Sequence, residues 1–232
     1  MVQKRTNILI VGASKGIGRA VADLAITRPD FQVIAAARNV STMQGTPNLT
    51  RMDLDLVNQA SIENFAKQVK AQFESIDYLL FNAGTLVNKP FQQITHQDIS
   101  QMFQVNVLSA FSLIQLLIPE LAKAKQGAHV VTIGSMGGVQ GSAKFSGLSA
   151  YSSSKAALAV LSECLAEELK PFNISVNCLA LGAVQTQMLA NAFPDFSTSM
   201  SPESMASYIL DFLVNGNKYF NGKVLPVATT TP

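Results

Sequence analysis

The sequence has little charge, no tryptophan and only two cysteines among its 232 residues. Charged residues make up 14% of the chain, well below the roughly 25% of an average soluble protein. Hydrophobic residues reach 48%, which excludes a disordered or fibrous protein and requires that much apolar surface be buried. A sheet covered on both faces, an apolar pocket or a subunit interface would bury it.

An excess of one charge is also lacking, because 17 Lys and Arg residues stand against 15 Asp and Glu residues and no stretch carries five like charges. We therefore expect no nucleic acid as a partner. His96 and His129 have no partner at metal-ligand spacing, so we expect both at the surface or at a strand edge and predict no metal site. Cys164 and Cys178 match no disulfide framework, and we expect both to fill the core of a protein in a reducing compartment.

Long hydrophobic runs are missing as well. The first apolar run, Ile8 to Val11, follows Lys4 and Arg5 but is too short for a signal peptide. No uninterrupted apolar run approaches the roughly 18 residues of a membrane span. We therefore expect a cytoplasmic protein without membrane contact.

Short apolar runs alternate with longer stretches of helical spacing along the whole chain. The runs predict strands over 7–11, 31–37, 49–52, 76–81, 128–133, 174–179 and 223–227, and the stretches predict helices over 16–28, 59–74, 97–125, 149–170 and 202–214. This alternation predicts an α/β fold in a single domain, residues 1–232, with a Rossmann-type doubly wound parallel sheet of seven strands and helices on both faces. Segments 135–148 and 182–200 are predicted to be irregular and to contact the substrate.

The first predicted strand ends in a glycine-rich turn that opens the first predicted helix. Glycine permits the tight turn and the close approach of backbone to a pyrophosphate, which then lies at the positive N-terminus of the helix. The glycines are spaced as Gly-x-x-x-Gly-x-Gly. We expect this turn to bind a dinucleotide through Gly12, Ser14, Lys15, Gly16, Ile17 and Gly18.

The end of the second predicted strand indicates which dinucleotide is bound. A fold that binds NAD is expected to carry an acidic residue there for the ribose 2′-hydroxyl, whereas this chain has Arg38. Arg38 offers a planar guanidinium to a 2′-phosphate, and Lys15 could add a second positive charge. The sequence therefore favours NADP(H) as the cofactor.

Tyr151 and Lys155 stand four residues apart at the start of a predicted helix, so they share one face. A phenol with a reference pKa of about 10 exchanges protons poorly near neutrality unless a cation stabilises the phenolate. Lys155 can supply that cation. The pair therefore predicts acid–base catalysis.

Together with these motifs, several further positions make the chain resemble the short-chain dehydrogenase/reductase family from end to end. They are Asp55, the run Asn82-Ala83-Gly84, Asn106, Ser135 and Thr186. The resemblance implies that Tyr151 transfers a proton and that Lys155 lowers its pKa and holds the nicotinamide ribose. It implies that Ser135 binds the carbonyl oxygen and that Asn106 supports a water relay.

The resemblance also assigns roles in cofactor binding. Asp55 is expected to bond adenine, and Asn82, Ala83 and Gly84 are expected to line the adenosine ribose and the nicotinamide side. Thr186 stands where the family contacts the carboxamide or the diphosphate. Phe81 and Leu181 depart from the usual asparagine and proline, and we expect the loss of proline to free the backbone near the carboxamide.

The predicted helices 97–125 and 149–170 are more apolar than one contact with a sheet requires. They predict a homodimer or homotetramer, which the family resemblance also implies. The tail 227–232 lacks the glycine pair common after the last strand of the family, which weakens the expectation of a standard tetramer.

These observations predict an NADP(H)-dependent oxidoreductase that transfers hydride between nicotinamide and a small-molecule carbonyl or alcohol. The alternative is a non-catalytic dinucleotide-binding sensor or scaffold. Another substrate class is a 3-oxoacyl group on an acidic carrier protein, which would need basic residues beside the site, just before the fifth and sixth strands. Lys123, Lys125 and Lys170 stand there, but Phe172 interrupts the series.

A small free substrate is therefore favoured over a carrier-bound one. Apolar residues of the two irregular segments could line its pocket, namely Phe145, Met188, Leu189, Phe193 and Phe196.

Overall fold

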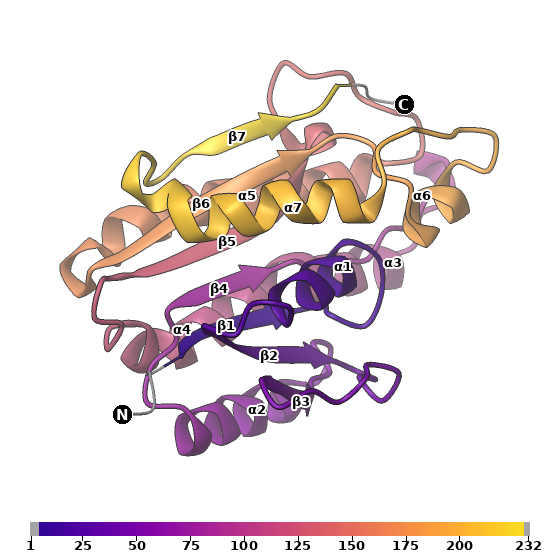
Figure 1. The fold of residues 1–232 in the computed structure, drawn as a ribbon. Coiled ribbons are helices and arrows are strands. Elements are labelled where there is room, and N and C mark those ends of the chain that lie inside the picture. The colour runs from indigo at the N-terminus through magenta and orange to yellow at the C-terminus, as the bar shows by residue number, and fades with distance from the viewer. Residues whose placement is uncertain (1–4, 230–232) are drawn as a thin grey trace.

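The centre of the molecule is a parallel sheet of seven strands (Figure 1). The computed structural model describes residues 5–229, so the expectations about Lys4 and about residues 230–232 lie outside the described part. The strands are β1 Thr6–Val11, β2 Phe31–Ala37, β3 Leu49–Asp53, β4 Tyr78–Phe81, β5 Ala128–Ser135, β6 Ile174–Leu181 and β7 Val224–Val227. They are joined in the order β3-β2-β1-β4-β5-β6-β7, and each neighbouring pair is parallel.

This strand order places a crevice between β1 and β4. The chain moves outward from β1 to β3 and then returns to the other side of β1 as β4. The loops that follow β1 and β4 therefore diverge, and the carboxyl ends of the strands open at this point, where α/β sheets bind ligands.

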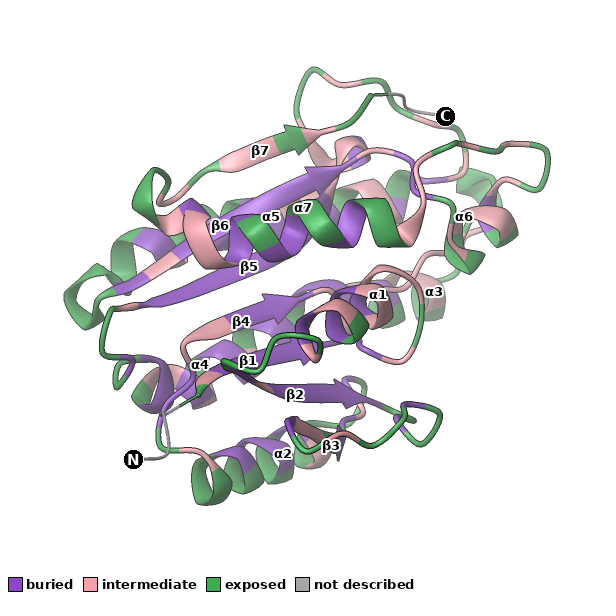
Figure 2. Cartoon of the chain, viewed as in Figure 1, coloured by how far each residue is buried: buried purple, intermediate pink, exposed green. Residues whose placement is uncertain are grey.

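Helices cover both faces of the sheet and leave their outer sides exposed (Figure 2). They are α1 Gly16–Ala25, α2 Gln59–Gln72, α3 His96–Phe103, α4 Ser109–Leu121, α5 Ser149–Glu168, α6 Gln187–Ala192 and α7 Pro202–Asn215, with a π-helical turn η2 Gln104–Leu108 and short 3-10 turns η1 Phe91–Gln93, η3 Met136–Gly138, η4 Lys170–Phe172 and η5 Gly216–Lys218. Side chains alternate along β1, so Leu9 packs with α2, α4 and α5 while Ile8 and Ile10 pack with α1 and α7. The predicted fold class is confirmed.

Side-chain caps explain where several helices begin. The Asn58 side chain accepts hydrogen bonds from the amides of Ala60 and Ser61 at the start of α2. Thr95 and Asp98 form a reciprocal capping box at α3, and Ser201 caps α7 ahead of Pro202. Each cap satisfies amides that have no partner inside the helix.

The prediction that 182–200 is irregular throughout is wrong, because α6 forms within it. The Thr186 hydroxyl accepts a hydrogen bond from the Leu189 amide at 3.3 Å and caps this helix. A helix of six residues is too short to show a helical repeat in the sequence, and only tertiary contacts stabilise such a short element.

The region predicted as one helix over 97–125 runs from His96 to Leu121 and contains the π-helical turn η2. Within residues 5–229 it is the one helix long and apolar enough to cross a membrane by length and composition. Its inner side is occupied, however, because Leu113, Ile114 and Leu117 are fully buried in the core beneath the sheet.

Two placements expected from the sequence are wrong. His129 is fully buried in β5, where its Nδ1 donates to the Leu213 carbonyl at 2.9 Å and its Nε2 accepts from the Asn177 amide at 2.9 Å. These bonds join β5, β6 and α7. Cys164 is exposed on α5, whereas Cys178 is buried as expected.

The buried imidazole makes the stability of the fold dependent on pH. Burial lowers the pKa of His129 to about 4, whereas an unfolded chain restores a value of about 6.5. As the pH falls from 7 to 5, the unfolded state therefore binds a proton that the folded state rejects, which costs about 2 kcal/mol of stability. Urea unfolding of wild type and His129→Gln at both pH values measures this effect, and we expect the variant to lose less stability on acidification. An equal loss in both proteins would contradict it.

Candidate active site

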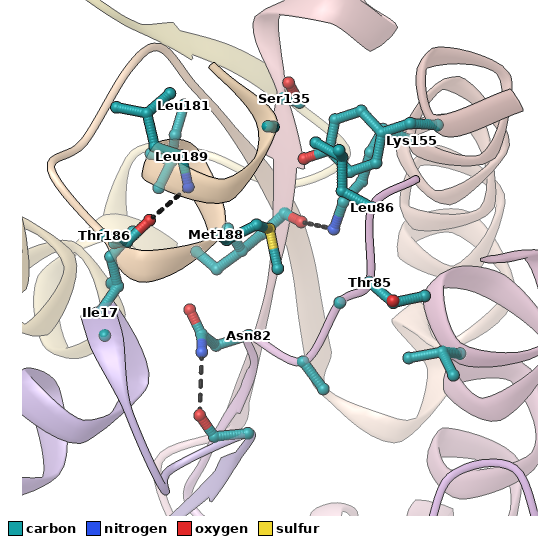
Figure 3. Close-up of a pocket in the computed structure, with 18 of the residues that line it drawn as sticks. Ile17, Asn82, Thr85, Leu86, Ser135, Lys155, Leu181, Thr186, Met188 and Leu189 are labelled. Carbon is teal, nitrogen blue, oxygen red and sulfur yellow. Dashed lines mark hydrogen bonds between the residues drawn. The ribbon is translucent and has the colours of Figure 1, made fainter. Parts of the chain in front are cut away.

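A cavity of about 550 Å³ opens at the carboxyl ends of the central strands (Figure 3). Loops after β1, β4, β5 and β6 surround it. Most of the residues selected from the sequence line this one cavity: Gly12, Ser14, Lys15, Gly16, Ile17, Arg38, Asp55, Asn82, Ala83, Gly84, Ser135, Tyr151, Lys155 and Thr186. Gly18 and Asn106 lie behind its wall.

The turn after β1 is held tightly against the segment that follows β4. Gly12 has φ +86°, and a Cβ added there would lie 2.8 Å from the Cα of Ala83. The side-chain amide of Asn82 donates to the Gly12 carbonyl at 3.1 Å, and the Gly12 amide donates to the Ala36 carbonyl at 2.8 Å. Only glycine fits this position, because both the backbone angle and the space exclude a side chain.

The N-terminus of α1 faces the same cavity without a cap. The N-cap residue is Lys15, and its side chain makes no capping hydrogen bond. The first amides of α1 are therefore free of a side-chain cap at a point where the helix dipole favours an anion. Gly18 does not reach the cavity, but it packs against Gly12 and Asn82 and so allows α1 to approach β1 and β4 closely.

Two cations line the cavity at the carboxyl ends of β1 and β2. Arg38 directly follows β2, and Lys15 lies in the β1–α1 turn; both are exposed. Within residues 5–229 neither forms an ion pair with a carboxylate. Asp55 lies nearby, and its carboxylate accepts a hydrogen bond from the Val57 amide at 3.1 Å.

Ser135, Tyr151 and Lys155 meet at the inner end of the cavity. Ser135 is the last residue of β5, while Tyr151 and Lys155 lie in the first turns of α5. The Nζ of Lys155 donates to the Ile133 carbonyl at 2.7 Å, as Figure 3 shows. α5 thus carries two of these groups to the end of β5, which carries the third.

The buried setting shifts the protonation of both groups on α5. Burial raises the pKa of Tyr151, and a hydrogen bond to Ser135 lowers it in part. Burial also lowers the pKa of Lys155 to about 8. At neutral pH Tyr151 is therefore a neutral phenol, and Lys155 is mostly a cation. Ser135 is thus the neighbour that lowers the pKa of Tyr151 in this structure, whereas the sequence predicted that Lys155 would lower it.

Asn106 lies in η2, behind the wall of the cavity, and is fully buried. Its side-chain oxygen accepts from the Thr85 amide at 2.8 Å, and its nitrogen donates to the Thr85 carbonyl at 3.0 Å and to the Ser154 hydroxyl at 2.9 Å. Asn106 thus joins the loop after β4 to α5. Its position in the π-helical turn places its side chain between these two elements.

Leu181 does not free the backbone as expected. It is the last residue of β6, where it is paired in register with Ser135 of β5 and Val227 of β7. The strand continues to the cavity because leucine, unlike proline, keeps the N–H that a sheet interior uses. Thr186 lines the cavity a few residues later and caps α6.

Apolar side chains line the part of the cavity formed by the loops after β5 and β6, which we call the chamber. Phe145, Met188, Leu189 and Phe193 line it as expected from the sequence, whereas Phe196 does not. The cavity is also lined by Leu86, Asn88, Gln101, Leu148 and Ala192, which were not predicted from the sequence. Asn88 and Leu86 follow the Asn82-Ala83-Gly84 run in a long loop, which was a usable signal for a site.

The basic residues considered for carrier docking lie away from the cavity of their own chain. Lys123 and Lys125 precede β5 and Lys170 precedes β6, so they stand at the amino ends of strands whose carboxyl ends form the site. β5 has eight residues, and at about 3.3 Å per residue these two ends are roughly 25 Å apart.

Residues 6–196 match the family model described as short chain dehydrogenase. The chain belongs to the short-chain dehydrogenase/reductase family. It is therefore an oxidoreductase of that family, with the Rossmann-type fold expected from the sequence.

Two relatives of known name are identical to this chain at about a third of the aligned residues. A 3-oxoacyl-(acyl-carrier-protein) reductase of Salmonella typhimurium is 31% identical over 185 residues, which cover 78% of this chain and 74% of that protein. Carbonyl reductase family member 4 of Xenopus laevis is 30% identical over 229 residues, 94% of each chain.

Solved structures of the family superpose over almost the whole chain. The Pseudomonas aeruginosa RhlG/NADP active-site complex has a TM-score of 0.85 at 26% identity and covers 97% of this chain and 95% of that one. A short chain dehydrogenase of Shigella flexneri complexed with NADP has a TM-score of 0.85 at 27% identity, with coverage of 97% and 98%.

Proposed function

We propose that this protein is an NADP(H)-dependent carbonyl reductase, or the reverse alcohol dehydrogenase, acting on compact, uncharged substrates. The observation that carries the proposal is that Ser135, Tyr151 and Lys155 line the same cavity as the glycine-rich turn and the apolar chamber. A sensor or scaffold would have no need of proton-transfer groups at that junction.

The groove fits a dinucleotide with a 2′-phosphate. The uncapped N-terminus of α1 and the space beside Gly12 would hold the pyrophosphate, and Arg38 with Lys15 would bind the 2′-phosphate. Asp55 would bond adenine, and the run Asn82-Ala83-Gly84 would line the adenosine ribose and the nicotinamide side. Thr186 would hold the carboxamide or the diphosphate. Two structural neighbours are complexes with NADP. When bound, NADPH supplies the hydride that the carbonyl carbon accepts.

Tyr151 would donate the proton to the carbonyl oxygen. Its raised pKa keeps the phenol protonated at neutral pH, which suits an acid in the direction of reduction. The Ser135 hydroxyl would hydrogen-bond the same oxygen, and the cationic Lys155 would stabilise the phenolate that remains. Asn106 would hold the loop after β4 against α5 through its hydrogen bonds to Thr85 and Ser154. This part of the cavity would then support the water relay that returns a proton to Tyr151.

The substrate class follows from the charges of the cavity. Its charged lining residues are Lys15, Arg38, Asp55 and Lys155, and the first three lie in the cofactor groove. The chamber beyond Tyr151 has apolar and amide side chains, so a charged substrate would lose hydration there without a counter-ion. The distance between Lys123, Lys125 or Lys170 and this chamber gives no support to docking of a carrier protein on the same chain.

We also propose that residues 1–232 form one dinucleotide-binding and catalytic domain of a cytoplasmic homo-oligomer. Leu108 and Phe111 on one helical region and Val160 on α5 are 49%, 51% and 56% exposed. These apolar side chains point away from the core that α4 and α5 share, which favours a two-fold contact through these helices.

Cofactor choice is the first test. We expect NADPH to bind at least tenfold more tightly than NADH, a difference of about 1.4 kcal/mol, because Arg38 adds one charge-assisted contact. Titration of both cofactors into wild type and Arg38→Ala should show that the variant loses the preference. Arg28→Ala, which removes an arginine paired with Asp30 instead, is the matched control and should retain it. Equal affinities of wild type for both cofactors would disprove the assignment.

Proton transfer is the second test. On a carbonyl found by following NADPH oxidation over ketones, aldehydes, quinones and 3-oxoacyl thioesters, Tyr151→Phe should lower turnover at least about a hundredfold. Cofactor affinity should change little, because the phenyl ring keeps the packing. Tyr219→Phe, at a tyrosine that is 79% exposed, should behave as wild type. Near-normal turnover of Tyr151→Phe would mean that another group supplies the proton.

Assembly is the third test. We expect a dimer or tetramer in light scattering at micromolar concentration and a smaller species for Phe111→Arg, since a buried arginine without a partner opposes association. Phe91→Arg alters an aromatic residue that is also exposed but lies on η1, and it should leave the assembly intact. A monomeric wild type would rule out the proposed interface.

A further inference from the structure

Three loops around the chamber converge on one side chain, Asn88. It belongs to the loop after β4, and its amide nitrogen donates to the Ala192 carbonyl at the end of α6 at 2.7 Å. Its neighbour Lys89 donates from the backbone to the Gly147 carbonyl at 3.1 Å, in the loop after β5. Ala192 and Gly147 lie 104 and 59 residues after Asn88 in the sequence, so these contacts are tertiary.

Gly147 lies directly against the side chain of Asn88. It has φ +83°, and a Cβ added there would overlap the side-chain oxygen of Asn88. The Asn88 side chain is therefore confined on one side by Gly147 and bonded on the other to Ala192. Its position is fixed more closely than one hydrogen bond alone would require.

α6 depends on this contact because it is too short to be stable alone. Its six residues are capped by Thr186, and the carbonyl of its last residue, Ala192, receives the Asn88 amide. The rings of Phe145 and Phe193 meet edge to face, with centroids 6.2 Å apart. These rings come from the same two loops that Asn88 holds, and both line the chamber.

We propose that Asn88 is a specificity-determining residue that sets the size of the substrate. By tying the loop after β4 to α6 and packing on Gly147, it holds Phe145 and Phe193 together across the far side of the chamber. A compact carbonyl compound fits beside Tyr151 with this closure intact, whereas a long chain must separate the two rings. The proposal rests on the carbonyl reductase function proposed above and extends it to chain length.

Kinetics with methyl ketones from butanone to decan-2-one tests the proposal. Loss of the hydrogen bond in Asn88→Ala should raise kcat/KM for decan-2-one relative to butanone at least about tenfold, mainly through a lower KM for the long ketone. An equal change of kcat/KM for both ketones would contradict the proposal, because it would not depend on chain length. Asn215→Ala instead removes side-chain hydrogen bonds with Asp211 and Lys218 and should keep the wild-type ratio.

Two further variants keep the test decisive. Asn88→Asp keeps the shape but has no donor for the Ala192 carbonyl, and Gly147→Ala displaces Asn88 from the opposite side. Both should shift the ratio in the same direction as Asn88→Ala. A ratio within twofold of wild type in folded Asn88→Asp and Gly147→Ala would overturn the proposal, even if Asn88→Ala does not fold.

Hydrogen exchange gives a readout that needs no turnover. Amides of α6 and Phe193 should exchange at least about fivefold faster in Asn88→Ala than in wild type, whereas amides of β5 should not change. Unchanged exchange in α6 would show that Asn88 does not hold the helix and would overturn the proposal. If wild type binds NADPH but reduces no carbonyl, the proposed function fails, and the exchange result alone then decides whether this contact closes the chamber.

Discussion

The contact between Gly12 and Ala83 is the constraint on which the rest of the site depends. Because the turn after β1 lies directly against the segment after β4, α1 starts beside the crevice and directs its free amides into it. Asn82 secures the contact through the Gly12 carbonyl, and Gly18 lets the helix approach. A methyl group at residue 12 would push this turn away from Ala83. The change would disturb the part of the cavity proposed to bind the dinucleotide, and it would leave the proposed proton-transfer residues in place.

The sheet and the main lining of the cavity could be predicted from the sequence because their signals are local and repeated. Apolar runs of strand length recur between longer helical patterns, and a parallel sheet brings the residues at all carboxyl ends to one edge. Ser135 at the end of β5 and Tyr151 at the start of α5 could therefore be placed together from the sequence alone. The glycine-rich turn needed only its position between a strand and a helix.

The errors concern residues whose surroundings come from distant parts of the chain. His129 reads as a polar residue near a strand start, yet Leu213 and Asn177 satisfy both of its nitrogens inside the core. Cys164 reads as core material, but its place on α5 turns it outward. α6 and the role of Asn88 depend on contacts across more than a hundred residues, for which a single sequence carries no periodic signal.

The π-helical turn between α3 and α4 has a consequence for how this helix is compared with others. Five residues, Gln104–Leu108, complete a turn that an α-helix would make with about four, so the stretch contains in effect one inserted residue. A helical wheel drawn for α3 is therefore out of phase by roughly 100° when it is continued into α4. An alignment that places a gap within this turn keeps both halves in phase. An alignment without a gap rotates the expected inner face of α4 by that angle relative to α3.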